Sequence, residues 1–198
     1  MLWGMEITAP QEIKALTHPL RLDLLELLAV SGPATAARCG RVLGVPQANC
    51  SFHLRQLAKY GFVVDAGPGE DRRERIWQLP EVRPTLRIPP GADSVLERQL
   101  RRVVVEREAR AILDYAGRRE REDPPWRDTG TVMTAVAICS PEDALEIKDK
   151  WKALLEPYLA RTAAESQLRA GQRHVRYFMA ATPISDPDPE DKDRDSSH

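Results

Sequence analysis

Residues 34–61 have the sequence ATAARCGRVLGVPQANCSFHLRQLAKYG, and they decide the fold because their pattern is typical of two short helices joined by a tight turn. The spacing predicts one helix over 36–43 and another over 47–60. Pro46 is tolerated in the first turn of the second helix, where a missing N–H costs little, and Gly61 is a C-terminal stop. A helix-turn-helix is therefore predicted.

Apolar residues mark the inner faces of these two helices. In the second helix Cys50, Leu54 and Leu57 recur at i, i+4 and i+7, which places them on one stripe. Thr35 is the expected N-cap of the first helix. The inner residues expected there are Ala36, Cys39, Val42 and Leu43. Because Cys39 and Cys50 both fall on inward stripes, we expect core thiols rather than metal ligands.

The outer face of the second helix carries an aromatic ring among amides and cations. At about 100° per residue, Phe52 points about 160° away from Leu54. The outward residues are Ala48, Asn49, Phe52, Arg55, Gln56 and Lys59, with Ser51 on the flank. Amides reach base edges, an apolar ring contacts thymine methyls and arginine holds guanine or phosphate, so this mixture suits a DNA major groove. The alternative is a solvated face with one stray aromatic, and the helix alone leaves it open.

A β-hairpin is predicted directly after the second helix. Residues 62–64 are apolar, 67–71 have turn chemistry and 75–79 alternate between two faces. The basic residues at or just beyond the tip are Arg72, Arg73 and Arg75. A basic hairpin beside a helix-turn-helix is a winged helix, whose wing arginines contact phosphates or enter the minor groove. The alternative is a solvated turn in which Asp71 and Glu74 cancel the arginines.

Two further helices are predicted before the helix-turn-helix, over 10–16 and 19–30. They are separated at His18-Pro19, since proline disfavours the α conformation in the residue before it. The second of them carries a leucine-rich stripe and is expected to be largely buried. His18 is interpreted as a structural residue at the helix junction.

Length and composition exclude several classes of protein. A chain of 198 residues with 42% hydrophobic content is one domain or two small ones with ample core. No apolar run is long enough to span a bilayer and the N-terminus lacks a secretory pattern, so we expect a cytoplasmic protein with reduced thiols and no membrane association. Neither a phosphate loop nor a hydrolase or metalloprotease motif is visible. We expect no enzymatic activity, no catalytic residues, no metal and no cofactor.

Charge is distributed unevenly along the chain. The net charge is only −1. Residues 34–87 nevertheless carry nine Arg and Lys against five Asp and Glu, whereas 183–198 carry two against six. The balance is therefore +4 around the predicted winged helix and −4 in the tail. The basic region favours a polyanionic partner, and the acidic, proline-bearing tail over 183–198 is predicted to be disordered.

Three segments resemble bacterial ArsR-like winged helix-turn-helix transcriptional regulators: ALTHPLRLDLLELL at 15–28, VPQANCSFHLRQLAKYGFV at 45–63 and PGEDRRERIWQL at 68–79. The resemblance covers roughly residues 8–80. It implies a symmetric dimer whose recognition helices bind operator DNA. The metal-sensing members carry paired cysteines or terminal Asp/His sites, and neither pattern is visible here. The resemblance therefore does not extend metal sensing to this chain.

The DNA-binding residues follow from the outward face, the wing and the resemblance taken together. They are Gln47, Ala48, Asn49, Ser51, Phe52, Arg55 and Lys59 on the recognition helix, with Arg72, Arg73 and Arg75 on the wing. The expected partner is double-stranded DNA, bound by a homodimer on an inverted-repeat operator, with repression as the expected mode of control. The alternative is a winged-helix module for protein–protein contact, in which Phe52 is a hydrophobic anchor.

The chain after the wing is predicted to contain a linker over 81–92 and a long helix over 93–119. The helix has apolar residues on two opposite faces, which favours contact with the same helix of a second subunit over burial between two layers of one chain. Residues 131–181 are predicted to form a small accessory domain, with strands at 131–138 and 174–181 around a helix that starts at Ser140.

An effector pocket in the accessory domain is a second interpretation of its aromatic residues, which more simply form a core. Its lining would be Trp126, Cys139, Trp151, Tyr158, His174 and Tyr177. The expected fold class is thus mainly α with an α+β character: an N-terminal winged helix-turn-helix, a long connecting helix and a small C-terminal β-α-β unit. The expected function is sequence-specific regulation of transcription, with an unidentified small-molecule effector left open.

Overall fold

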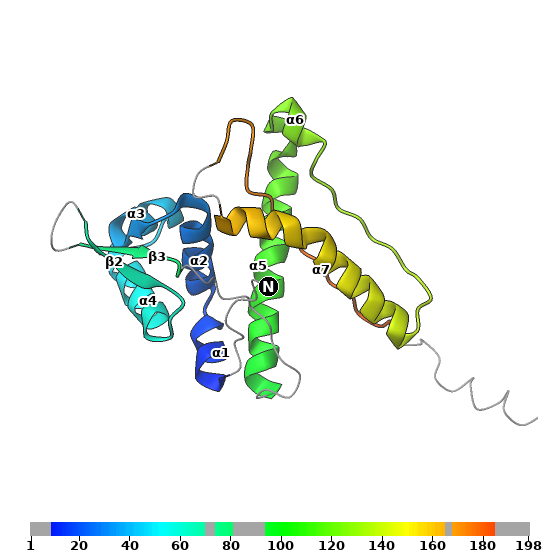
Figure 1. Cartoon of the computed structure of the whole chain (residues 1–198), viewed down its shortest axis with the longest axis horizontal. Helices are drawn as coiled ribbons and strands as arrows, with labels where there is room; N and C mark the ends of the chain where they lie inside the picture. Colours follow the sequence, from blue (N-terminus) through cyan, green and yellow to red (C-terminus); the bar gives the residue numbers. More distant parts are fainter. Residues whose placement is uncertain (1–8, 70–73, 81–93, 165–167, 185–198) are drawn as a thin grey trace, which may run out of the picture.

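The computed structural model of the chain describes residues 9–69, 74–80, 94–164 and 168–184. Helices dominate, and one small antiparallel sheet lies beside them (Figure 1). The helices are α1 Pro10–Leu16, α2 Pro19–Ser31, α3 Ala36–Leu43, α4 Gln47–Lys59, α5 Ser94–Arg118, the 3-10 turn η1 Arg119–Arg121, α6 Pro124–Arg127 and α7 Pro141–Ala164. The strands are β1 Ala34–Thr35, β2 Val64–Pro68 and β3 Arg75–Gln78. The mainly helical class with an N-terminal helix-turn-helix is confirmed.

The N-terminal helices begin and end close to where their sequence signals predict. Pro19 opens α2 and His18 before it is extended, as a residue preceding proline must be. Thr35 caps α3, because its hydroxyl accepts a hydrogen bond from the Arg38 N–H at 3.3 Å. Gly44 ends α3 in the left-handed conformation at φ 67°, which costs a glycine little.

The wing is a hairpin completed by a third strand. β3 pairs with β2 on one side and with β1 on the other, so the strand order is β1-β3-β2. Ala34 lies opposite Trp77, and Val64 lies opposite Gln78. The hairpin was predicted, but β1 was not, because two residues ahead of a helix carry no strand period. The tip itself, including Arg72 and Arg73, lies outside the described residues.

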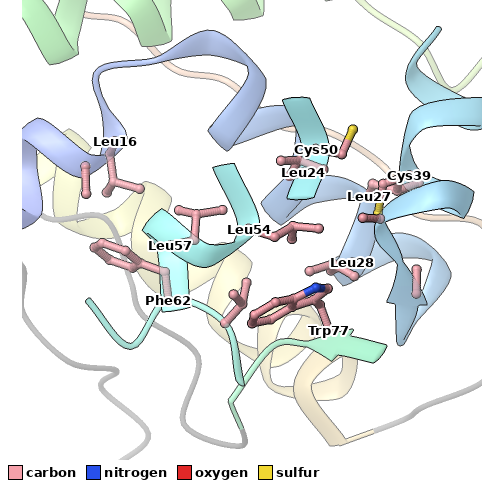
Figure 2. Packing of buried hydrophobic residues seen from close by; sticks show 14 of the residues in the cluster. Leu16, Leu24, Leu27, Leu28, Cys39, Cys50, Leu54, Leu57, Phe62 and Trp77 are labelled. Carbon is pink, nitrogen blue, oxygen red and sulfur yellow. The ribbon is translucent and has the colours of Figure 1, made fainter. Parts of the chain in front are cut away.

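One core holds the winged helix together. Figure 2 shows Leu54 of α4 facing the leucines of α2, Leu57 on the side of Phe62 and Leu16, and Trp77 closing the core from the wing side. The stripe of Cys50, Leu54 and Leu57 is fully buried, as predicted. Val42 departs from its prediction: it lies on the exposed side of α3, because Gly40 rather than Val42 faces α4.

The long helix α5 is tied to the winged helix by one of its two apolar faces. Leu100 is fully buried in the common core, with Leu96 and Val104 packed beside it. The opposite face is open to solvent in the single chain, where Val105 is 51% and Leu113 71% exposed. The predicted division of this helix into two apolar faces is confirmed, and the second face has no cover within the described chain.

The C-terminal β-α-β unit predicted over 131–181 is wrong in its strands. Residues 131–138 and 174–181 form no strand, although both are described. Apolar and β-branched residues favour the extended conformation, but a strand exists only where a neighbouring strand pairs with it. The helix between them is correct: Ser140 and Asp143 form a reciprocal cap, with bonds of 3.1 and 2.9 Å. It continues beyond Pro157 to Ala164.

Ion pairs attach the segment after α7 to the rest of the molecule. Arg173 binds Glu122 at 2.8 Å and lies over the Trp126 ring at 5.3 Å. Arg176 pairs with Glu26 of α2 and reaches Glu108 of α5 at 3.5 Å. The C-terminal segment is thereby fixed to both the winged helix and the long helix.

Several expectations fall on parts of the chain outside the described residues. The linker predicted over 81–92 and almost all of the acidic tail over 183–198 belong there. Among the described helices, none combines the length and the apolar character that crossing a membrane would require.

Candidate nucleic-acid interface

The exposed face of α4 is built by the packing of its other face. Because the buried stripe is clamped against α2 and the wing, the helix cannot rotate, and the opposite residues must face solvent. Phe52 is 56% exposed there. Its ring meets the edge of the His53 ring at 5.2 Å between centroids, with the planes 80° apart. The aromatic residue predicted to point outward therefore does so.

The recognition helix and the wing share a hollow of about 320 Å³. It is lined by Ala36, Gln47, Ser51, Arg55, Glu74, Arg75 and Trp77. Within it, Arg55 donates a hydrogen bond to the Ser51 hydroxyl at 2.8 Å, which holds the guanidinium along the helix. Arg75 reaches it from β3, while one of its nitrogens lies 2.8 Å from an Asp65 carboxylate oxygen. Two cations and two polar side chains thus converge from separate elements.

The remaining predicted residues are distributed around this hollow. Ala48, Asn49 and Lys59 are exposed on α4, and the Lys59 ammonium lies 5.5 Å from the centre of the Tyr60 ring. Glu74 is an acid in the hollow that the predicted site did not include. Asp65 is a second acid close by, outside the lining, and its carboxylate pairs with Arg75. In the described part of the wing, Arg75 therefore has two acids near it, and Glu74 is one that the solvated-turn alternative named.

A cluster behind the recognition helix was missed by sequence reasoning. His53 of α4 stacks on His18 of the α1–α2 junction, with ring centroids 4.2 Å apart. Arg21 donates through Nε to Nδ1 of His53 at 3.2 Å, and through a terminal nitrogen to the Ala15 carbonyl at 2.7 Å. The signal was present in two motifs, His-Pro-x-Arg and Ser-x-His-Leu, but only folding brings them together.

This cluster makes stability dependent on pH. Burial, His18 and Arg21 lower the pKa of His53, while burial and Arg21 lower the pKa of His18 against a small opposing effect of Asp23. The unfolded chain therefore takes up protons near pH 6.5 more readily than the folded one. The folded state is stabilised relative to the unfolded state while both histidines are neutral, above that pH. This contribution to the free energy of unfolding is lost as the pH falls below it.

We expect the free energy of unfolding to decrease from about pH 7 to pH 5 in the wild type, as measured by urea denaturation. His53→Gln keeps an acceptor for Arg21 but cannot titrate, so its stability should change less over this range. Lys150→Ala, on the exposed surface of α7, is the control and should follow the wild type. An equal slope for His53→Gln and wild type would contradict the assignment.

The buried thiols belong to the core. Cys39 and Cys50 are both fully buried, as predicted. Burial and the neighbouring Cys50 raise the pKa of Cys39 to about 11, so this thiol stays protonated at neutral pH. Thiolate is the form that binds metals, and within the described residues no three potential ligands gather into one group.

The structure does not gather the residues that were proposed to line an effector pocket around one common hollow. Trp151 meets Tyr177 edge to face at 6.4 Å, whereas Cys139, Tyr158 and His174 are exposed. A hollow of about 340 Å³ does lie beside the C-terminal segment. It is lined by charged and aliphatic residues of α2, α3 and α5 together with Arg176, rather than by the aromatic set.

Fold and site together define a winged helix-turn-helix protein, in which an exposed polar and aromatic helix face lies beside a β-hairpin. Comparison with protein families agrees: residues 16–65 match the family model described as a helix-turn-helix domain. No protein of curated function matches the chain.

Solved structures of bacterial regulators resemble the chain at low sequence identity. The transcriptional regulator Tm0710 from Thermotoga maritima is 17% identical, covering 75% of this chain and 80% of its own, with a TM-score of 0.30. NMB1585, a MarR family regulator from Neisseria meningitidis, is 15% identical over the same shares, with a TM-score of 0.31. A mutant of ZitR from Lactococcus lactis is 14% identical over 71% and 75%, with a TM-score of 0.31.

Proposed function

We propose that this protein is a sequence-specific DNA-binding regulator of transcription, and specifically a repressor of the ArsR-like type that acts as a homodimer. The observation that carries the proposal is the exposed face of α4, where Gln47, Ser51 and Arg55 line one hollow with Arg75 of the wing. An aromatic ring held in solvent at Phe52 is costly unless it has a partner, and a thymine methyl is one.

Arg55 and the wing arginines have different proposed roles. Arg55 is anchored to Ser51 on the recognition helix, so it is positioned for base edges in a major groove. Arg72 and Arg73 belong to the wing tip in the sequence and are assigned to phosphates or the minor groove. Base contacts confer sequence preference, whereas phosphate contacts confer affinity on any duplex.

The dimer is proposed on the solvent-open face of α5. Val105 and Leu113 lie on it, and large apolar side chains at helical spacing are typical of a helix–helix interface. A two-fold axis through this region would present two recognition helices to successive major grooves about one helical turn apart. The operator is accordingly proposed to be an inverted repeat.

The proposed roles predict different outcomes for two variants. Selection of bound fragments from a random duplex pool supplies the operator. Arg55→Ala should then relax preference at one or two base pairs and cost about 1–3 kcal/mol on the operator. Arg72→Ala with Arg73→Ala should weaken operator and random DNA equally and reduce the slope of log K against log salt by about 2. Fluorescence anisotropy measures both, with Lys150→Ala as the unaffected control.

A protein–protein module is the competing function, and Phe52 favours it because an exposed ring is also a hydrophobic anchor. The salt titration separates the two. A flat dependence of duplex binding on salt would remove the DNA function, since phosphate neutralisation must release counterions. We further propose that the protein has no enzymatic activity and works in the cytoplasm, where operators are located.

A further inference from the structure

Helix α7 carries an apolar seam that the chain itself leaves open. Ile147, Trp151, Leu154 and Tyr158 follow one another at intervals of four, three and four residues, which is the spacing of a helix–helix seam. Ile147 is 52%, Leu154 62% and Tyr158 56% exposed, while Trp151 is half-buried against Tyr177. The large residues are therefore aligned but not covered.

A helix of this kind needs a partner to be stable. Most helical stability in proteins comes from packing of an apolar face, and Pro157 removes one backbone hydrogen bond from the interior of α7. Among the described helices and strands, none has more than a marginal contact with α7. Figure 1 shows it crossing α5 in that view and continuing well beyond it, away from the winged helix.

The exposed apolar surface is concentrated in this part of the molecule. Among the described residues, 14 of the 21 large hydrophobic side chains that are exposed lie between 132 and 184. Exposed apolar side chains gathered in one region are typical of surfaces that contact another protein.

The open face of α5 carries a second seam with the same spacing. Val105, Ala109, Ile112 and Ala116 are also four, three and four residues apart, and Leu113 lies beside them. Two of its four positions are alanine, whereas α7 has tryptophan and tyrosine at the corresponding places. Large residues on one helix facing small ones on the other allow side chains to interdigitate.

We propose that α7 of each protomer packs against α5 of a second copy of this chain, so that the two copies exchange this helix, while the Arg173 and Arg176 ion pairs keep the segment after it on its own chain. In a parallel arrangement Trp151 would lie beside the partner's Ala109 and Tyr158 beside the partner's Ala116. This proposal rests on the dimer of the proposed function and names the element that occupies the α5 face.

Charge and symmetry both favour a second copy as the occupant. In the same parallel register, Asp143 at the start of α7 lies at the level of the partner's Arg101, which is exposed and has Glu97 of its own helix as its other acid. Each chain has one seam on α7 and one on α5, so a two-fold exchange covers all four seams of the dimer at once. A foreign partner would leave one of the two seams open.

The test joins two different chains through the predicted contact. Cys139 is an exposed thiol and is first replaced in both chains by Cys139→Ser, while Cys39 and Cys50 are buried. One chain then carries Ile112→Cys and the other Leu154→Cys. After co-expression, oxidation with copper phenanthroline should give a covalent heterodimer that neither single variant gives. Ala153→Cys in place of Leu154→Cys is the control, because it lies next to the seam residue but about 100° round the helix.

Three results would overturn the exchange: cross-linking of Ile112→Cys with itself, equal cross-linking by Ala153→Cys, or a monomeric mass for the wild type in light scattering. Conversely, Leu154→Glu with Tyr158→Glu should convert a dimeric mass to a monomeric one while the winged helix keeps its circular dichroism. None of these measurements uses DNA. If the cross-link fails but salt-dependent DNA binding is retained, the exchange is wrong and the proposed function stands. If the cross-link forms but duplex DNA is not bound, the proposed function is wrong and the exchange stands.

Discussion

Gly40→Ala should destabilise the protein by about 2–3 kcal/mol, although alanine is the better helix former. A Cβ built at this position would lie 2.7 Å from the Val45 carbonyl oxygen and 3.3 Å from the Gln47 nitrogen. Both atoms belong to the backbone of the turn, so no side-chain rotation can relieve the overlap. The propensity gain of up to about 1 kcal/mol is smaller than the cost of moving α4 away from α3.

Urea denaturation followed by circular dichroism measures the expected loss. Gly117→Ala provides a matched control, because Gly117 is also helical and a Cβ there would meet nothing within 4 Å. It should be neutral or stabilise the protein by up to about 1 kcal/mol. If both substitutions shift the midpoint in the same direction, the close approach of α3 and α4 at Gly40 is not a constraint.

Arg107→Met should cost about 3 kcal/mol, because it removes the cation at the centre of an ion-pair cluster with little exposure to solvent. Arg107 lies 2.9 Å from an Asp23 oxygen and 2.7 Å from a Glu108 oxygen, and it also pairs with Glu26. Glu108 is only 9% exposed, so water can solvate it poorly after the substitution. Methionine retains the apolar length of the side chain and isolates the effect of charge.

Arg176→Met is the comparison within the same cluster. Arg176 lies at its edge, 3.5 Å from Glu108, with about a third of the side chain exposed. Its loss should cost about 1 kcal/mol or less, because an exposed ion pair contributes little. Thermal denaturation of both variants and of the double variant measures the difference. Equal losses for the two single variants would show that Arg107 is not the centre of the cluster.

The winged helix could be predicted from sequence because its signals are local. Thr35 as a cap, Gly61 after α4 and the stripe of Cys50, Leu54 and Leu57 each depend on residues within a few positions of one another. The exposure of Phe52 followed from that stripe, since a helix with one face clamped must present the other.

The predictions that failed concern elements whose partners are remote in the chain. β1 exists because β3, some 40 residues later, pairs with it. Residues 131–138 are rich in apolar and β-branched residues, as strands are, yet they find no strand partner in the described chain. Val42 was assigned inward from helical spacing, but the close contact at Gly40 rotates α3 so that Val42 is exposed.

By itself, the sequence determined the helices α1 to α5 and α7, the turn between α3 and α4, and which face of α4 would carry the polar and aromatic residues; the short helix α6 was not predicted. Only the tertiary structure decided that His18 stacks on His53, that Arg176 and Arg107 share the acids of α2 and α5, and that the α7 seam stays open. The physical reason is the distance along the sequence over which each interaction acts. Caps and periodicity act over a turn or two of helix, whereas a ring stack or an ion-pair cluster joins residues that only folding brings together.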